Sequence, residues 1–245
     1  MLKLGVNIDH ITTLREARYR GLPNGEPDLQ AAVRICEKAG AYGITAHLRE
    51  DRRHIQDRDL KMLREVVSIR LNMEMANTEE MIRIALGLKP EIVCIVPENR
   101  EEVTTEGGLN VVGQLSSIRE TVNQMKEAGI ETSLFIDPDP DQIQACADSG
   151  AEFIELHTGA FCERFKTGDF EGEFIRLQKA AIAAHEQGIL VNAGHGLDYD
   201  NLKQIHEVPH LIELNIGHSI ICRSIFTGLE KAVKEMLVLM QGYGD

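Results

Sequence analysis

Residues 42–49 read YGITAHLR, and in this stretch apolar and polar side chains alternate. The apolar parity holds Ile44, Ala46 and Leu48, and the polar parity holds Thr45, His47 and Arg49. Because successive side chains of a β-strand point to opposite faces, the stretch predicts a strand with one apolar and one polar face. Polar side chains are costly to bury, so a polar face inside an enclosed sheet indicates a functional site.

The pattern recurs along the chain, in strand-like segments at residues 4–9, 42–49, 69–75, 91–97, 131–137, 153–159, 188–194 and 211–217. Only the fourth segment lacks a polar set near its end. Helix-like stretches lie between the segments, at residues 28–39, 57–68, 78–87, 114–128, 139–149, 170–187, 199–207 and 219–241. Several of them open with Asp, Ser or Thr and close with Gly, as helix capping favours.

Eight strands that alternate with helices predict an α/β fold, a (β/α)8 TIM barrel in a single domain over residues 1–245. An open, doubly wound sheet is the alternative, but no GxGxxG follows the first strand, and polar strand ends along nearly the whole chain favour a ring. The stretches 15–27 and 98–113 exceed normal loop length, so additional short helices or long βα loops are expected. The loop over residues 98–113 is a candidate lid.

Bulk properties narrow the class of protein. The 245 residues are 43% hydrophobic and carry a net charge of -13, which argues against a general binder of nucleic acid or of anionic membranes. Small phosphorylated ligands stay possible, because local Arg, His and backbone N–H groups can hold them. We find no signal peptide or membrane span, and the five cysteines form no CxxC pair. A cytoplasmic protein with reduced cysteines is expected.

Glu74 is the sharpest single candidate for catalysis. It lies between two methionines near a strand end, where its carboxyl should have a raised pKa and could exchange protons near neutral pH. The alternative is a structural carboxylate paired with an arginine. His47 and Arg49 share the polar parity of one strand, and His54 follows in the loop; a solvated charged run is the alternative there, above all for residues 51–53.

Two Gly-His turns are the strongest loop signal. NAGHG spans residues 192–196 and NIGHS spans residues 215–219, after the seventh and eighth segments. Barrels often hold phosphate at this place, since glycine lets backbone N–H groups approach an anion closely. His195 lies between two glycines, exposed to the mouth of the barrel. Ordinary tight turns are the alternative.

The remaining candidates bear on metal and imine chemistry. Asp9 beside His10 could belong to a metal site, but no HxH, HExxH or Cys pair supports one, so no metal is expected. Glu155 and His157 form a second acid–base pair or a supporting set. No lysine occupies a strand end, and Lys166 lies in a predicted loop, which argues against a lysine Schiff base.

The motifs GVNIDH, HLREDRRHI, NMEMA, VPENREEVTTEGG, FIELHTG, VNAGHGL and ELNIGH follow one another from the first strand to the last. In this order they resemble the pyridoxine 5′-phosphate synthase family. The resemblance implies a TIM barrel that condenses 1-deoxy-D-xylulose 5-phosphate with 3-amino-2-oxopropyl phosphate into the pyridine ring of vitamin B6, releasing phosphate and water. It also implies a homo-octamer that requires no metal and no organic cofactor.

The same resemblance implies roles for individual residues. His47 and Glu74 would be general bases, His195 the proton donor, and Glu155 a further residue important for activity. The aminoketone phosphate would be bound by Asn7, Gly196, Gly217 and His218. The deoxyxylulose phosphate would be bound by Asp9, His10, Arg49, His54 and Thr104. Arg18 matches an arginine that contacts substrate.

Two other functions stay open from the residues alone. A phosphosugar isomerase or epimerase on the same barrel would share the phosphate turns and a carboxylate base, but it would need no amine substrate. A non-catalytic sensor of a phosphorylated ligand would need Arg49 but not the proton transfer at Glu74. In each case the partners are small molecules.

Overall fold

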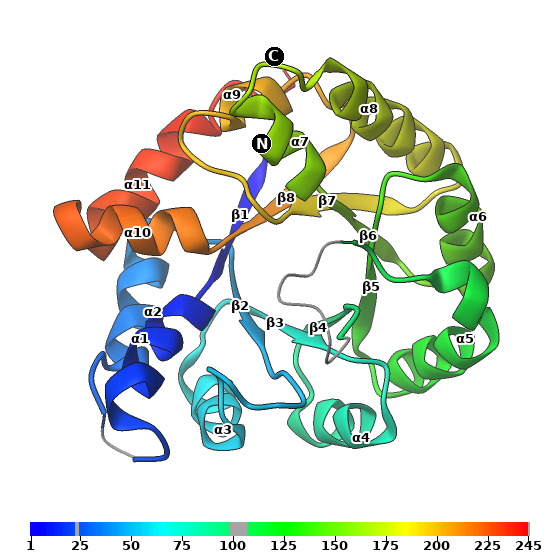
Figure 1. The fold of residues 1–245 in the computed structure, drawn as a ribbon. Helices are drawn as coiled ribbons and strands as arrows, with labels where there is room; N and C mark the ends of the chain where they lie inside the picture. The colour runs from blue at the N-terminus through cyan, green and yellow to red at the C-terminus, as the bar shows by residue number, and fades with distance from the viewer. Residues whose placement is uncertain (23–24, 99–106, 245) are drawn as a thin grey trace.

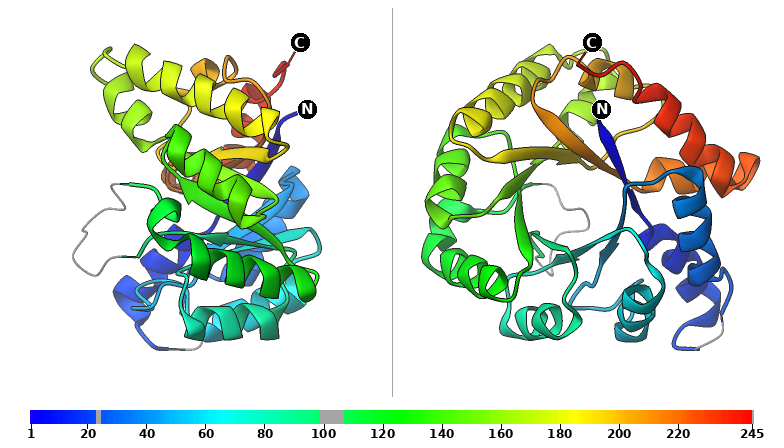
Figure 2. Two further views of the ribbon diagram at one scale, coloured as in Figure 1. Left: turned by 90° about the vertical axis from the view of Figure 1, so that its right-hand side faces the viewer. Right: turned by 180° about the vertical axis from the view of Figure 1, so that it is seen from behind.

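The computed structural model describes residues 1–22, 25–98 and 107–244. Eight parallel strands pair in chain order, and β8 pairs back with β1, so the sheet closes into a barrel. Helices surround the barrel on the outside (Figure 1), and the view from behind shows the same ring (Figure 2). The predicted (β/α)8 TIM barrel is confirmed, and the open sheet is excluded.

All eight predicted strands are present, with ends that differ from the prediction by a few residues. Their bounds are β1 Lys3–Asn7, β2 Gly43–His47, β3 Arg70–Met75, β4 Ile92–Ile95, β5 Glu131–Ile136, β6 Phe153–His157, β7 Leu190–Gly194 and β8 Leu211–Ile216. The register joins members of the polar parity: Asn7 pairs with Thr45, and His47 pairs with Glu74. Neighbouring strands therefore bring their polar side chains to the same level of the barrel.

The helices are α1 Asp9–Tyr19, α2 Leu29–Ala39, α3 Asp57–Val66, α4 Glu79–Leu88, α5 Val111–Glu127, α6 Pro140–Ser149, α7 Gly159–Phe165, α8 Glu171–Glu186, α9 Leu202–Ile205, α10 His218–Thr227 and α11 Leu229–Leu239. Two of the predicted acidic caps are seen in full. The Asp28 side chain accepts from two backbone N–H groups of α2, and Asp139 does the same for α6. Such caps satisfy N–H groups that have no partner within the helix.

The structure corrects three expectations about the helices, whereas the short helix α7, which follows β6, is one of the additional short helices that were expected. The predicted loop over residues 15–27 begins inside α1, where Arg15 is buried and forms a bidentate ion pair with Asp59 (2.9 and 2.6 Å). The predicted helix over residues 219–241 is two helices, since Gly228 has φ 81° and ends α10. The helix expected over residues 199–207 contains one short turn, α9.

The main hydrophobic core lies between the barrel and its helices. The apolar parity of the strands supplies fully buried side chains such as Ile44, Leu71, Met73 and Leu156, which pack with the inner faces of the helices. Each buried side chain of this size contributes about 2 kcal/mol of transfer free energy. A second, small cluster of Cys94, Val96 and Phe135 belongs to the opposite parity. The apolar fourth segment noted in the sequence therefore lines the interior of the barrel.

The stripe Val233, Met236, Leu237 and Met240 on the last helix belongs to the core, with Leu237 partly buried against it. Two of the most exposed large apolar side chains, Ile225 and Phe226, lie near the end of α10, and Val238 is exposed on α11 itself. In the described part of the chain, no helix has both the length and the apolar composition needed to cross a membrane.

Candidate active site

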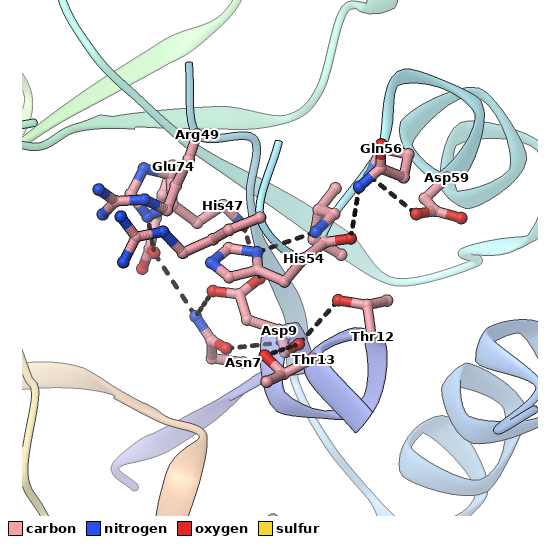
Figure 3. Close-up of polar contacts among 12 residues, drawn as sticks. Asn7, Asp9, Thr12, Thr13, His47, Arg49, His54, Gln56, Asp59 and Glu74 are labelled. Carbon is pink, nitrogen blue, oxygen red and sulfur yellow. Dashed lines mark hydrogen bonds and ion pairs between the residues drawn. The ribbon is translucent and has the colours of Figure 1, made fainter. Parts of the chain in front are cut away.

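The carboxyl ends of β1, β2 and β3 bring an amide, two carboxyls and an imidazole together (Figure 3). Asn7 Nδ2 donates to Asp9 Oδ2 at 2.9 Å and to Glu74 Oε2 at 3.5 Å. The backbone N–H of His47 donates to Asp9 Oδ1 at 2.9 Å, and His47 Nδ1 lies 3.8 Å from Glu74 Oε2. The predicted pair of bases, His47 and Glu74, is therefore adjacent at the top of two paired strands.

His47 has a second partner that sequence reasoning did not identify. Its Nε2 lies 2.7 Å from Glu98 Oε1, while Glu98 Oε2 accepts from the backbone N–H of Glu50. A hydrogen bond from Nε2–H to this carboxylate leaves Nδ1 as the basic nitrogen, directed at Glu74. Burial alone would raise the pKa of Glu98, but the contacts with His47 lower it on balance, so Glu98 stays ionised.

The Glu74 carboxyl is tuned for proton exchange. Burial raises its pKa well above the usual value, the negative charges of Asp9 and Glu155 raise it further, and the hydrogen bond from Asn7 acts in the opposite direction. The sequence predicted a raised pKa from the methionines on either side. However, Met73 and Met75 belong to the opposite parity and are fully buried in the outer core. The raised pKa of Glu74 therefore comes from burial of the carboxyl inside the barrel and from the neighbouring acids, and not from the two methionines.

Glu155 lies deeper in the barrel, on β6, and its side chain is almost completely buried. The pKa of its carboxyl is raised to about 8, chiefly by burial; the hydrogen bond from Asn215 acts against this shift, and the nearby charge of Glu213 adds to it. Two carboxyls with raised pKa values, Glu74 and Glu155, thus face the same interior. Such a pair is typical of sites that perform general acid–base chemistry.

The opposite side of the mouth is built from histidines. His195 has a left-handed backbone (φ 77°) and is followed by Gly196 with φ 82°, which turns the chain back over the barrel. The ring centroids of His195 and His157 are 5.1 Å apart, and those of His10 and His218 are 4.9 Å apart. Burial, together with the neighbouring imidazoles of His157 and His10, lowers the pKa of His195 to about 4, so the unliganded residue is neutral at pH 7.

His157 is held in place by Asp137, the last residue of the fifth predicted segment. Asp137 Oδ1 lies 3.0 Å from His157 Nδ1, and this hydrogen bond lowers the pKa of Asp137. The bond leaves Nε2 of His157 on the side of His195 and Gly159. His157 was predicted as half of an acid–base pair with Glu155, and the structure shows Asp137 as its partner.

A cavity of about 690 Å³ joins both sides, within the range of small-molecule sites. The predicted site residues that line it are Asn7, Asp9, His10, His47, Arg49, Glu74, Glu155, His195, Gly196, Gly217 and His218. His54 is not among its lining residues: it lies behind His47, with Nδ1 accepting from the Ile55 N–H. Arg18 is exposed in the last turn of α1 and does not line this cavity. Thr104 falls outside the described residues, as does half of the predicted lid, residues 99–106.

Lys166 is a correction to the sequence analysis, which left lysine out of the site. It follows α7 and lines the cavity. The prediction considered only strand ends and did not include α7, so it could not place a residue that this helix carries to the mouth. Phe135 was missed as well, because an apolar side chain on the inner parity of β5 gives no polar signal.

Three side chains that line the cavity, Asp9, His47 and Glu74, are also suited to hold a cation. One ligand atom each from Asp9, His47 and Glu74 lies within 4.8 Å of the others. A nitrogen and two carboxylate oxygens suit a divalent transition metal, and Glu98 behind His47 is the kind of supporting carboxylate that metal-binding histidines often have. The absence of a metal requirement stays a prediction.

The raised pKa of Glu155 can be tested by measuring how the stability of the fold depends on pH. The folded carboxyl has a pKa of about 8, against 4.5 as the ordinary value, so between these pH values the folded state holds a proton that the unfolded state has lost. The group therefore costs stability progressively as the pH rises. Replacing Glu155 with Gln should increase the free energy of unfolding by about 3–4 kcal/mol more at pH 8 than at pH 5. Urea unfolding at both pH values measures this, and equal changes would contradict the assignment.

Together the fold and the site define a TIM-barrel enzyme whose acid–base groups and Gly-His turns share one mouth. The family profile described as "Pyridoxal phosphate biosynthesis protein PdxJ" matches residues 4–242, and the chain belongs to this family. A pyridoxine 5′-phosphate synthase of Synechococcus sp. is 56% identical over 236 residues, covering 96% of this chain and 97% of the relative. One of Opitutus terrae is 54% identical and covers 98% and 99%.

Solved structures of other proteins share the fold alone. The structure of KGPDC from Streptococcus mutans aligns with a TM-score of 0.66 over the full length of both chains, at 12% identity. At such low identity the likeness supports the barrel and carries nothing about the reaction.

Proposed function

We propose that this protein is a pyridoxine 5′-phosphate synthase, acting through residues 1–245 as one domain. It condenses 1-deoxy-D-xylulose 5-phosphate with 3-amino-2-oxopropyl phosphate and releases phosphate and water. The observation that carries the proposal is the shared cavity: Glu74, His47 and His195 line it together with both Gly-His turns. The names of the relatives, at more than 50% identity over nearly the whole chain, support the same reaction.

The chemistry requires many proton transfers in one enclosed space. An imine forms between the amine of one substrate and the ketone of the other, and then phosphate is lost, water is eliminated and the ring closes. Each step adds or removes a proton, so several acid–base groups are needed within reach of one another. Nδ1 of His47 and the Glu74 carboxyl are adjacent and serve as bases, and Glu155 lies below them in the same cavity.

Two phosphorylated substrates need two anion sites. Gly196, Gly217 and His218 form one site, where α10 begins directly at His218 and directs its N-terminal N–H groups to the mouth. Gly217 packs against Asn7, and a Cβ atom there would lie 2.8 Å from Asn7 Cβ, so the turn requires glycine. Arg49 and His54 supply the second anion site, although His54 lies outside the lining of the cavity. Asp9, His10 and Thr104 contact other parts of the same substrate, and Thr104 lies outside the described residues.

His195 acts as the proton donor only when it carries a proton. In the unliganded cavity burial holds its pKa at about 4, so it is neutral at pH 7. A phosphate group bound at the neighbouring Gly196 turn brings negative charge close to the ring and raises this pKa. Substrate binding thus charges the donor when it is needed.

The proposal is tested by mixing the purified protein with both substrates. Pyridoxine 5′-phosphate is detected by its fluorescence, and one phosphate should be released for each product molecule. Omission of the aminoketone should stop both signals. Turnover of the deoxyxylulose phosphate alone would instead indicate an isomerase or epimerase, and binding without turnover would indicate a sensor.

The proposal includes a homo-octamer in the cytoplasm, with the small-molecule substrates as its other partners, no nucleic acid or membrane partner and no required metal or organic cofactor. The exposed pair Ile225 and Phe226 on α10, at 71% and 87% exposure, supports an interface with another copy. Replacing Phe226 with Asp should reduce the mass in light scattering from eight chains to a smaller assembly. Ile175→Asp, at an exposed apolar position on α8, is the matched control. A monomeric wild-type protein, or an unchanged Phe226 variant, would contradict this part.

A further inference from the structure

A chain of hydrogen bonds crosses the barrel below the mouth and ends at Glu155. Asn72 Nδ2 donates to Thr45 Oγ1 at 3.4 Å, Thr45 Oγ1 donates to Asn215 Oδ1 at 2.9 Å, and Asn215 Nδ2 donates to Glu155 Oε2 at 2.7 Å. All four side chains are buried, Thr45 completely. The proposed reaction assigns a role to Glu155 alone among them.

Two of these bonds pass over an intervening strand. Thr45 on β2 reaches Asn215 on β8 across β1, and Asn215 reaches Glu155 on β6 across β7. The intervening strands provide glycine at these places. A Cβ atom on Gly5 would lie 2.1 Å from Asn215 Oδ1, and one on Gly194 would lie 2.2 Å from Glu155 Oε1. The backbone thus leaves room for this chain of side chains and for no additional atom beside it.

The hydroxyl of Thr45 determines which way the Asn215 amide is turned. An amide group offers an oxygen that accepts and a nitrogen that donates. Because the Thr45 hydroxyl donates to Oδ1 of Asn215, the amide nitrogen is turned toward Glu155. Without that hydroxyl the amide could rotate and present its oxygen to the carboxylate, where two acceptors would repel each other.

We propose that Asn215 is a positioning residue for Glu155, and that Thr45 fixes the orientation of the Asn215 amide. The inference rests on the proposed function, since it explains how one member of that site is held. Asn215 keeps the carboxyl in one rotamer under the reacting substrates and stabilises its ionised form. The titratable groups that face Glu155 are Glu213 on β8, Glu74 on β3 and Cys94 on β4, and the test leaves all three in place.

The experiment compares Thr45→Val with Thr45→Ser across the pH profile of kcat. Valine keeps the volume and removes the hydroxyl, whereas serine restores the donor. In the valine variant the limb of the pH profile that belongs to Glu155 should move to higher pH by about one unit, because the ionised carboxylate loses its hydrogen-bond donor. At pH 7 the ionised fraction of Glu155 then falls, and kcat should fall about tenfold. The serine variant should return close to the wild-type profile.

Asn215→Ala removes the side chain that donates directly to Glu155, so the same limb of the pH profile should move to higher pH. It leaves space rather than an overlap, so the barrel should remain folded, which circular dichroism checks. Ser133→Ala is the control: Ser133 is equally buried, on β5, and forms no hydrogen bond to this chain. Profiles of Thr45→Val and Asn215→Ala that superimpose on the wild type would overturn the inference, and so would loss of the fold in both. A wild-type protein that makes no pyridoxine 5′-phosphate would overturn the proposed function instead.

Discussion

Replacement of Glu74 with Gln is expected to lower kcat by about 100-fold or more while each substrate still binds. Glutamine keeps the shape of the side chain and can still accept from Asn7, but it cannot take up a proton. General acid–base catalysis by one side chain contributes about 10²–10⁴ in rate, and the proposed function assigns the role of a base to Glu74, which lies next to His47. The measurements are steady-state turnover and calorimetric binding of each substrate singly.

The matched control for this change is Glu79→Gln. Glu79 lies in the exposed first turn of α4, five residues away, and the substitution there should leave kcat within about twofold of wild type. If Glu74→Gln retained wild-type turnover, Glu74 would not be the base. If it lost substrate binding instead, the residue would be a ligand contact, as a non-catalytic binding site would allow.

The second large effect is expected from one methyl group at Gly194. A Cβ atom there would lie 2.2 Å from Glu155 Oε1 and 2.9 Å from the backbone oxygen of Asn215. Glu155 is buried and held by Asn215, so it has little freedom to move away. Gly194→Ala should therefore lower kcat by about 100-fold and destabilise the fold by about 1–3 kcal/mol.

Gly172→Ala on α8 is the control for this substitution. A Cβ atom at Gly172 meets no heavy atom within 4 Å, and alanine favours the helix, so stability should stay the same or increase. Gly194→Ala should therefore show a lower unfolding temperature and a lower kcat than Gly172→Ala, as measured by thermal unfolding and turnover. Wild-type turnover in Gly194→Ala would mean that Glu155 need not occupy its observed position.

The sequence predicted the barrel and the inner face of its strands because both depend on a local rule. Alternation with a period of two places His47, Glu74 and Asn215 on one parity, and parallel pairing in chain order brings that parity together. Eleven of the predicted site residues line the cavity, and those on strands, such as His47, Glu74 and Glu155, reach it for this reason. Gly196, directly after His195, likewise marks a turn, since its φ of 82° is one that other residues adopt with strain.

The features that the sequence did not predict depend on contacts between distant residues. Arg15 and Glu16 fall in the stretch 15–27 that was predicted as a long loop, but both lie in helix α1, where Arg15 is buried because Asp59 of α3 neutralises it. The pairing of His47 with Glu98 joins residues 51 positions apart. The periodic pattern of apolar and polar residues along the sequence does not predict contacts between residues so far apart. The Gly228 break in the last predicted helix was missed because a single glycine does not always end a helix.

The central claim is that one cavity at the top of this barrel holds both phosphorylated substrates under Glu74, His47 and His195. A crystal structure of the Glu74→Gln variant with both substrates tests it most directly. The account predicts one phosphate at Gly196, Gly217 and His218, the other at Arg49 and His54, and the reacting carbon atoms between His47 and His195. Phosphate groups bound elsewhere on the protein, or substrates out of reach of these side chains, would contradict it.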